Sequence, residues 1–257
     1  MRATTKLRNL FASGRIAVAP GAYDGLTARL VEQAGFLAIY ASGGAIARST
    51  GIPDLGLMPV STIVERLASM VDVVEVPIVA DADTGYGNAL NARAAARAFE
   101  RAGVAAFHLE DQTFPKKCGH YDDKSLVPVS EMVQKLKAVR DALLDPDFVV
   151  IARTDAIAVE GFNAAIDRAS AYREAGADML FVEAPTSEDE IARIAKLLSG
   201  WKLFTPSYSL LKFGARAIDS GRKLSLWLRH SMETGASIPD LNEFSSPKHF
   251  RCIANRI

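Results

Sequence analysis

Cysteine is scarce in this sequence, and it has no excess of charge of either sign. Only Cys118 and Cys252 occur among 257 residues, far apart in the chain, which argues against a disulfide framework and favours a reducing compartment. Thirty basic and thirty acidic side chains cancel to a formal net charge of zero. We therefore expect neither nucleic acid nor a membrane surface as a partner, and an anionic ligand must be held by local groups.

Long apolar runs are also absent. No stretch approaches the roughly 20 uninterrupted apolar residues of a membrane-spanning helix. The N-terminal segment MRATTKLRNLFASGR is basic and mildly apolar, without the apolar core or cleavage site of a secretory leader. We expect a soluble, cytoplasmic protein, although organelle targeting and a plain surface helix both remain open for this segment.

What is present is a repeat of short apolar runs with helical segments between them, which predicts parallel strands joined by helices. Three of these helical segments end in Ala-Gly, with the glycine where a left-handed residue stops a helix. With 49% hydrophobic residues, the chain can bury the core of one (β/α) barrel domain over residues 1–257. The predicted strands are Ile16–Ala19, Phe36–Tyr40, Pro77–Ala80, Ala105–Leu109, Phe148–Ala152, Met179–Val182 and Lys202–Thr205.

Polar residues and glycines follow these strands, and in a parallel barrel the carboxyl ends of the strands converge on one mouth. An open doubly wound sheet would instead show a glycine-rich phosphate-binding fingerprint after its first strand, and none follows here. The pattern therefore favours a TIM-type (β/α)8 barrel.

Three carboxylates at successive strand ends indicate a metal site. Asp81 and Asp83 alternate, so both would point toward the mouth if both lay on a strand, and Glu110 ends the next strand. The alternative is that an aspartate before a glycine-rich turn is a cap or a turn former. Because no histidine or cysteine lies close to these acids in the strand pattern, Mg²⁺ is favoured over zinc, and Mn²⁺ is possible.

The run Phe114-Pro115-Lys116-Lys117-Cys118-Gly119-His120 predicts a loop in which a thiol lies beside two ammonium groups and an imidazole. Cationic neighbours favour the thiolate, so Cys118, Lys117 and His120 are candidate catalytic residues. The alternative is a solvated basic loop with an incidental cysteine.

Groups that could bind a carboxylate also follow strands. Arg153 could clamp one in a bidentate manner, or it could be a structural partner of Asp155 or Glu183. Ser42, Gly43 and Gly44 offer a hydroxyl and close-approach backbone N–H groups. His108 lies inside an apolar strand and is interpreted as a core residue.

At these residues the sequence resembles the isocitrate lyase/phosphoenolpyruvate mutase superfamily, and specifically its branch of lyases with a KKCGH loop. The resemblance covers about residues 5 to 200, in motifs that occur in the family's order. The matching motifs are Tyr40-Ala41-Ser42-Gly43-Gly44, Gly51-Ile52-Pro53-Asp54, Asp81-Ala82-Asp83-Thr84-Gly85-Tyr86-Gly87, Leu109-Glu110-Asp111-Gln112, the KKCGH loop, Ala152-Arg153-Thr154-Asp155 and Phe181-Val182-Glu183-Ala184-Pro185.

The resemblance implies a role for each group of residues. Asp81 and Asp83 would bind Mg²⁺, and Asp54 and Glu110 would hold its waters. Cys118 would be the catalytic acid/base, and Arg153 would be a catalytic residue that stabilises the growing negative charge. The residues implied or expected to contact a small carboxylate substrate are Tyr40, Ser42, Gly43, Gly44, Gly119, Arg153 and Glu183.

The implied activity is Mg²⁺-dependent cleavage of a carbon–carbon bond in a 2-hydroxy di- or tricarboxylate, of the methylisocitrate or dimethylmalate type. In the phosphonate-forming mutases of the superfamily the cysteine is absent from this loop, so the loop favours a lyase. An oxaloacetate hydrolase of the same superfamily and a catalytically impaired relative are the alternatives.

The C-terminal part departs from the family pattern, and about one βα unit is missing, so we count seven strands. Residues 206–257 are predicted to be a helical segment, with the last barrel helix around Leu210–Met232. The resemblance implies a homo-oligomer, a dimer or tetramer, in which this helix is swapped onto a neighbouring subunit through the apolar Leu224–Leu228 stretch.

Overall fold

The structure is a computed structural model that describes residues 1–14, 16–117, 123–204 and, for the backbone alone, 224–229. Eight strands in these residues form a closed barrel in sequence order. The strands are β1 (Ala17–Ala22), β2 (Ile39–Ala41), β3 (Ile78–Asp81), β4 (Ala106–Glu110), β5 (Val149–Thr154), β6 (Met179–Val182), β7 (Trp201–Phe204) and β8 (Leu224–Arg229).

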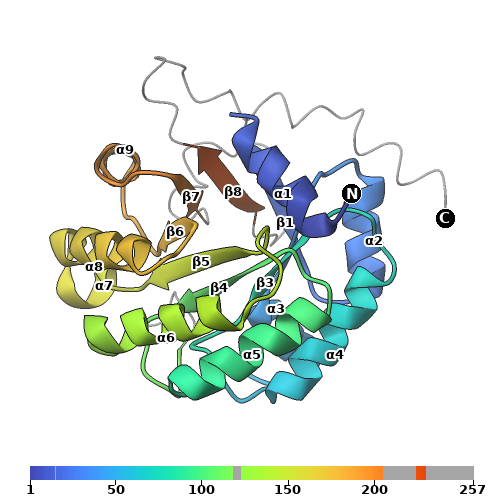
Figure 1. The fold of residues 1–257 in the computed structure, drawn as a ribbon, viewed down its shortest axis with the longest axis horizontal. Coiled ribbons are helices and arrows are strands. Elements are labelled where there is room, and N and C mark those ends of the chain that lie inside the picture. Colours follow the sequence, from blue (N-terminus) through green and yellow to red (C-terminus); the bar gives the residue numbers. More distant parts are fainter. Residues whose placement is uncertain (15, 118–122, 205–223, 230–257) are drawn as a thin grey trace.

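Helices surround the strands, as Figure 1 shows, and each of β1 to β6 is followed by at least one of them. The first seven strands pair in parallel with their neighbours, which confirms the predicted βα repeat and its seven parallel strands. The helices are α1 (Ala3–Ala12), α2 (Gly25–Gln33), α3 (Gly43–Ser49), α4 (Val60–Val71), α5 (Ala89–Arg101), α6 (Val129–Ala142), α7 (Ile157–Glu160), α8 (Phe162–Glu174) and α9 (Glu188–Leu197).

The eighth strand differs from the expectation. Residues 224–229, predicted as part of a helix that packs on a neighbouring subunit, instead form β8 between β7 and β1. This strand runs antiparallel to both, with Phe204 opposite Leu226 and Ala17 opposite Trp227. An antiparallel neighbour needs no crossover helix, so a chain that lacks one βα unit can still close its sheet. The rest of the predicted helical segment lies outside the described residues.

Inside the barrel, the inward-facing side chains change from apolar to charged toward the mouth. Along β4 the inward residues are Ala106, His108 and Glu110, and along β5 they end at Arg153 after two apolar residues. The intervening residues face outward and pack against the helices. Because side chains alternate along a strand, each strand supports the apolar core at one end and presents one polar group at the other.

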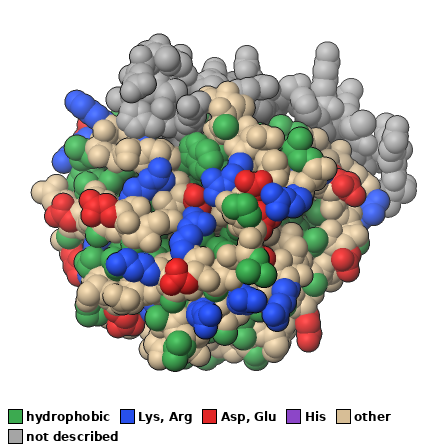
Figure 2. All heavy atoms as spheres, in the orientation of Figure 1, with side chains coloured by type: hydrophobic (Ala, Val, Ile, Leu, Met, Phe, Trp, Pro, Cys, Tyr) green, Lys and Arg blue, Asp and Glu red, His purple; other side chains and the backbone are tan. Residues whose placement is uncertain are grey.

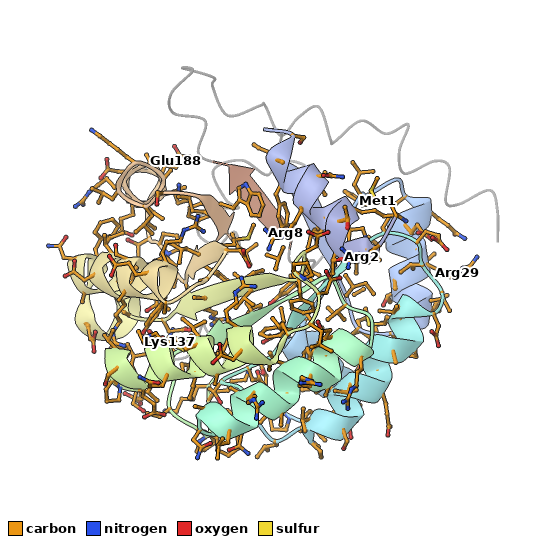
Figure 3. The ribbon with its side chains drawn as sticks, viewed as in Figure 1. Met1, Arg2, Arg8, Arg29, Lys137 and Glu188 are labelled. Carbon is orange, nitrogen blue, oxygen red and sulfur yellow. The ribbon has the colours of Figure 1, made fainter. Side chains whose placement is uncertain are left out.

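Helix α1 packs against the inner core at the other end of the barrel. Leu7 and Phe11 join the inner apolar cluster, and the Phe11 ring lies 5.2 Å from the ring of Trp201. Arg8, labelled in Figure 3, donates to the carbonyl oxygen of Asp147 at 2.8 Å and pairs with Asp178 at 3.0 Å. These contacts fix α1 to the start of the central strands.

The surface has no dominant charge. Basic and acidic side chains are interspersed over the face that Figure 2 shows, in agreement with the balanced composition. In the part of the chain that the structure describes, no helix has the length and apolarity to traverse a bilayer. The three glycines predicted to end helices, Gly35, Gly103 and Gly176, all have positive φ, between 86° and 106°, which confirms that prediction.

Candidate functional site

The charged side chains predicted to face each other do meet at the mouth of the barrel. Asp81 ends β3, Glu110 ends β4, Arg153 lies near the end of β5, and Glu183 follows β6. All four are buried. The parallel strands bring these residues together because their carboxyl ends share one edge, so residues up to about 100 positions apart in sequence surround one small volume.

Asp81 and Asp83 lie together, although for a different reason from the one predicted. Asp81 is the last residue of β3, but Asp83 lies beyond the strand and has a left-handed backbone with φ of 47°. Its backbone N–H donates to Oδ1 of Asp81 at 3.0 Å. A turn, not strand alternation, therefore brings the second carboxylate over the mouth.

The glycines after β2 allow two carboxylates to approach the backbone. Ser42 is the N-cap of α3, and its side chain accepts a hydrogen bond from the N–H of Ala45 at 3.3 Å. Gly43 N–H donates to Oδ2 of Asp81 at 3.2 Å. A Cβ on Gly43 would lie 2.9 Å from Asp81, and one on Gly44 would lie 2.5 Å from Oδ2 of Asp54.

Glycine is therefore required at both positions for packing, whether or not these residues contact a substrate. Any larger residue would push the acids out of the site, because contacts of 2.5 to 2.9 Å are not tolerated by real side chains. That Ser42, Gly43 and Gly44 also hold a substrate carboxylate stays a prediction.

Lys116 lies in the middle of the acids. Its Nζ is 2.5 Å from Oδ1 of Asp54 and 2.8 Å from Oδ1 of Asp83, and its side chain is only 4% exposed. From the sequence, Lys117 and not Lys116 is the predicted catalytic residue, but the Nζ of Lys117 donates to the carbonyl oxygen of Asp123 at 2.8 Å. The two adjacent lysines therefore make different contacts: Lys116 pairs with two acids of the site, whereas Lys117 binds a backbone carbonyl.

Arg153 is held by a second acid. Its Nε and Nη2 donate to the two carboxylate oxygens of Asp155 at 2.9 and 3.0 Å, and Lys124 Nζ reaches the same carboxylate at 2.9 Å. Nε also lies 3.4 Å from Oε2 of Glu110, and Nη2 lies 3.9 Å from Oε1 of Glu183. The interpretation of Arg153 as a structural partner of Asp155 is thus confirmed, and its substrate contact stays a prediction.

Behind Asp155 lies a buried polar network centred on Asp111. Oδ2 of Asp111 accepts hydrogen bonds from the hydroxyls of Thr154 at 2.7 Å and Tyr172 at 2.8 Å. Oδ1 accepts from the backbone N–H of Asp155 at 3.0 Å, and Arg168 lies 3.4 Å from Oδ2. This network fixes the backbone that carries Arg153 and Asp155. Composition gave no sign of it, because its members come from β5, from α8 and from the residues just after β4 and β5.

Tyr40 and His108 form a buried pair beneath the acids. The Tyr40 hydroxyl lies 2.7 Å from Nε2 of His108, and the same nitrogen is 3.4 Å from Oδ1 of Asp81. Burial lowers the pKa of His108 to about 4, so the imidazole is neutral at pH 7. His108 is the core residue that the sequence predicted, and Tyr40 is directed at it.

The pKa values of Asp81 and Asp83 are shifted in opposite directions. Burial opposes ionisation of Asp81, but His108, which is charged in the pH range where Asp81 titrates, and Lys116 lower the pKa of Asp81 to about 2. Burial and the charge of Asp81 raise the pKa of Asp83 to about 6. Burial also raises the pKa of Glu110 well above its usual value. The cluster therefore holds less negative charge than four free carboxylates would.

The chain on both sides of the predicted catalytic loop is anchored to the mouth. The Gln112 side chain donates to the carbonyl oxygen of Lys117 at 2.9 Å and accepts from its N–H at 3.0 Å. On the return side, Thr113 N–H donates to the carbonyl oxygen of Ser125 at 2.8 Å. Cys118, Gly119 and His120 lie outside the described residues, so their predicted roles stay predictions.

The acids fit a hydrated divalent cation better than a closed metal site. Among the described residues, no group of three or more His, Cys, Asp or Glu side chains could by itself hold a metal ion. Oε1 of Glu110 is buried and makes no hydrogen bond within the described part of the chain, so this oxygen can accept a hydrogen bond from a metal-bound water. Mg²⁺ keeps several of its waters and uses one or two carboxylates directly, which suits this arrangement.

The family model described as phosphoenolpyruvate phosphomutase matches residues 7–224. The chain belongs to this family. It is 44% identical over 204 residues to a 2,3-dimethylmalate lyase of Eubacterium barkeri, an alignment that covers 79% of this chain and 71% of that enzyme. It is 48% identical over 191 residues to a 2-methylisocitrate lyase of Bacillus subtilis, covering 74% of this chain and 63% of that enzyme. The chain thus spans less than two thirds of the second relative.

Solved structures agree with the fold. A crystal structure of 2,3-dimethylmalate lyase superposes with a TM-score of 0.75 at 38% identity, covering 78% of this chain and 68% of that one. An oxaloacetate acetylhydrolase gives 0.74 at 35% identity, with 76% and 68% covered. A phosphonopyruvate hydrolase in complex with oxalate and Mg²⁺ gives 0.71 at 39% identity, with the same shares covered. The family therefore includes lyases, hydrolases and an enzyme that binds Mg²⁺.

Proposed function

We propose that this chain is a Mg²⁺-dependent carbon–carbon lyase that cleaves a 2-hydroxy di- or tricarboxylate into a 2-oxo acid and a second carboxylate. The observation that carries the proposal is that a buried guanidinium and buried carboxylates lie together at the barrel mouth. Arg153 lies 3.4 Å from Glu110, and its charge also acts on Asp81. The two relatives at 44 and 48% identity are named for the cleavage of dimethylmalate and methylisocitrate, which supports this reaction class.

Four acids would hold the cation. Asp81 and Asp83 would bind it, and Asp54 and Glu110 would hold its waters. A bound Mg²⁺ supplies positive charge that polarises substrate oxygens and stabilises the negative charge that develops as the bond breaks.

The chain's own residues would carry the proton and charge movements. The substrate hydroxyl gives its proton to a basic group of the site, and the C–C bond breaks as the C=O bond of the 2-oxo acid forms. The electron pair of the broken bond passes to the carboxylate-stabilised fragment, which must then take up a proton. Arg153 would stabilise the growing negative charge, with its Nε and Nη2 held by hydrogen bonds to Asp155. The Cys118 thiol would deliver that proton. Lys117 and His120 would stabilise the thiolate that the transfer leaves, and Glu183 would support Arg153.

An assay of 2-oxo acid release from a panel of 2-hydroxy di- and tricarboxylates, with and without Mg²⁺, tests this proposal. We expect turnover of at least one dimethylmalate-like or methylisocitrate-like acid, lost when the metal is chelated. Cys118→Ser should lower kcat by about 100-fold or more, whereas Cys252→Ser, the matched control, should not. Equal rates for Cys118→Ser and the wild type would remove the cysteine from the mechanism, and no turnover by a folded wild type would favour an impaired relative.

Oxaloacetate hydrolysis is a second candidate, because an oxaloacetate acetylhydrolase superposes almost as well as the lyase does. Including oxaloacetate in the panel separates the two. Release of oxalate and acetate without cleavage of any 2-hydroxy acid would replace the lyase proposal with this one.

We also propose that the chain forms a dimer or tetramer. The route predicted from sequence, through a swapped helix at Leu224–Leu228, is not the one to expect, since these residues pair within the barrel as β8. Light scattering at micromolar concentration should give a mass of two or four chains, and a mass of one chain would contradict the proposal.

A further inference from the structure

The ammonium group of Lys116 lies where the proposed cation would have its acidic partners. It contacts Oδ1 of both Asp54 and Asp83, at 2.5 and 2.8 Å, and Asp81 and Glu110 are the next acids around it. A buried carboxylate that is neither paired nor bound to a metal is strongly disfavoured. In the metal-free protein, Lys116 is therefore the group that compensates the acids on this side of the site.

Among the described residues, the ion pairs of Asp54 and Asp83 are both with Lys116. Arg153 is bound to Asp155 and lies 3.4 Å from Glu110. His108 contacts Asp81, but it is neutral at pH 7 because of its burial. Lys124 is bound to Asp155. Removing the Lys116 ammonium without adding another cation would leave Asp54 and Asp83 facing each other.

From this geometry we infer that Lys116 is a tethered counter-cation that competes with the divalent cation for Asp54 and Asp83, so that metal binding displaces its ammonium group from the site. This inference rests on the metal role in the proposed function. An ammonium at 2.5 to 2.8 Å from a carboxylate oxygen occupies the place that a metal ion or its bound water would need. The Lys116 ammonium and a metal ion bound to the same acids would also repel each other, so the site favours binding one cation or the other.

The backbone around Lys116 makes such an exchange feasible. Lys117 is fixed by the amide of Gln112, and the backbone N of Lys116 lies beside the turn at Gly56, 3.4 Å from where a Cβ on that glycine would be. The lysine side chain has four rotatable bonds, so the ammonium can leave the acids while the main chain stays anchored. The metal-free and metal-bound sites would then differ chiefly in the position of one side chain.

Calorimetric titration with Mg²⁺ and Mn²⁺, in the absence of substrate, measures this competition. We expect Lys116→Gln to bind the cation at least tenfold more tightly than the wild type, because the competing charge is gone. Lys117→Gln removes the same charge from the next residue, whose ammonium contacts Asp123 instead, and its metal affinity should equal that of the wild type. Without metal, Lys116→Gln should melt at a lower temperature, and added Mg²⁺ should raise its melting temperature by more than that of the wild type.

A measurement on the wild type covers the case in which the variant fails to fold. An amine-acylating reagent followed by peptide mass spectrometry should label Lys116 slowly in the metal-free protein, because its side chain is only 4% exposed, and several-fold faster with saturating Mg²⁺. Labelling of Lys117 should not change. This readout does not depend on enzyme activity.

The outcomes separate the two proposals. If the wild type binds the cation but Lys116→Gln binds it no more tightly and Lys116 labelling does not respond to Mg²⁺, the displacement inference is wrong while the metal role stands. If neither protein binds Mg²⁺ or Mn²⁺, the metal role itself fails and the inference fails with it.

Discussion

The guanidinium of Arg153 and the carboxylate of Asp155 meet through two parallel hydrogen bonds, of 2.9 and 3.0 Å, inside the barrel mouth. The pair is two residues apart in sequence, and Lys124 completes it from the return side of the loop at 2.9 Å. Burial opposes ionisation of Asp155, but Arg153 and Lys124 lower the pKa of Asp155 to about 2, so it stays charged at any physiological pH. Asp155 thus connects the orientation of the guanidinium to the anchoring of the loop.

Asp155→Asn tests this connection. The amide keeps the volume but removes the buried anion that Arg153 and Lys124 share, so we expect the free energy of unfolding to fall by about 3 kcal/mol and kcat/KM to fall with it. Urea denaturation and the lyase assay measure the two effects. Asp167→Asn, an exposed acid on α8, should change neither. A variant as stable as the wild type would show that Asp155 is not the anion that compensates Arg153.

Gly44→Ala tests the packing of glycine against the acids. The added Cβ would lie 2.5 Å from Oδ2 of Asp54, so it must push that carboxylate away. We expect the affinity for Mg²⁺ to fall about tenfold, which corresponds to about 1.4 kcal/mol, with the fold retained. Calorimetry and circular dichroism provide the measurements.

Gly25→Ala is the matched control, since Gly25 is also in the first turn of a helix, and the atom nearest to an added Cβ there is the carbonyl oxygen of Ser69, at 3.3 Å. Its metal affinity should not change. If Gly44→Ala bound Mg²⁺ as tightly as Gly25→Ala does, Asp54 would have no part in holding the cation.

Tyr40→Phe tests the pair beneath the acids. The hydroxyl is buried and lies 2.7 Å from Nε2 of His108, so its removal leaves that nitrogen with Asp81 at 3.4 Å. We expect the free energy of unfolding to fall by about 1 to 2 kcal/mol, as for other buried hydrogen bonds. Tyr23→Phe, at a partly exposed ring, is the control. A change in KM without a change in stability would instead support the predicted contact between Tyr40 and the substrate.

Much of the barrel could be predicted from sequence because its signals are local. Apolar runs, Ala-Gly helix ends and polar residues after strands each reflect the conformation of a few neighbouring residues, and the ends of the seven parallel strands lie within three residues of where those signals placed them. The eighth strand could not be predicted this way. The alternation of Leu224, Leu226 and Leu228 with other residues suits a strand, but the family pattern favoured a helix there, and only pairing with β7 and β1 decides the matter.

The site was predictable residue by residue but not in its contacts. Acids at strand ends indicated a cation site, yet the reason for the proximity of Asp81 and Asp83 is a left-handed residue that strand periodicity does not reveal. Lys116 and Lys124 escaped notice because a lysine in a loop is usually solvated. Their burial depends on which acids the fold brings near them, and that information is spread over β3, β5 and the turn at Asp54.

Lys202 provides a test of pH dependence away from the site. It is almost fully buried on β7, where its Nζ donates to the carbonyl oxygen of Ala195 at 3.2 Å, and burial together with Arg173 lowers the pKa of Lys202 to about 8. In the unfolded chain the pKa of lysine is about 10.4. Between these two values the unfolded state binds more protons than the folded state, so the stability that involves this group rises with pH from about 8 to about 10.4, and below about 8 it is constant.

We therefore compare the wild type with Lys202→Met, in which the ionisable group is gone, by urea denaturation across this range. At pH 7 the wild type carries the cost of a buried ammonium, so Lys202→Met should be the more stable protein. From pH 8 to 10 the wild type should gain about 2 kcal/mol relative to the variant, out of the roughly 3 kcal/mol that a difference of a little over two pKa units at about 1.4 kcal/mol each gives in full. Lys196→Met, at an exposed lysine on α9, should run parallel to the wild type. A difference between wild type and Lys202→Met that stays constant with pH would mean that Lys202 titrates alike in the folded and unfolded chains.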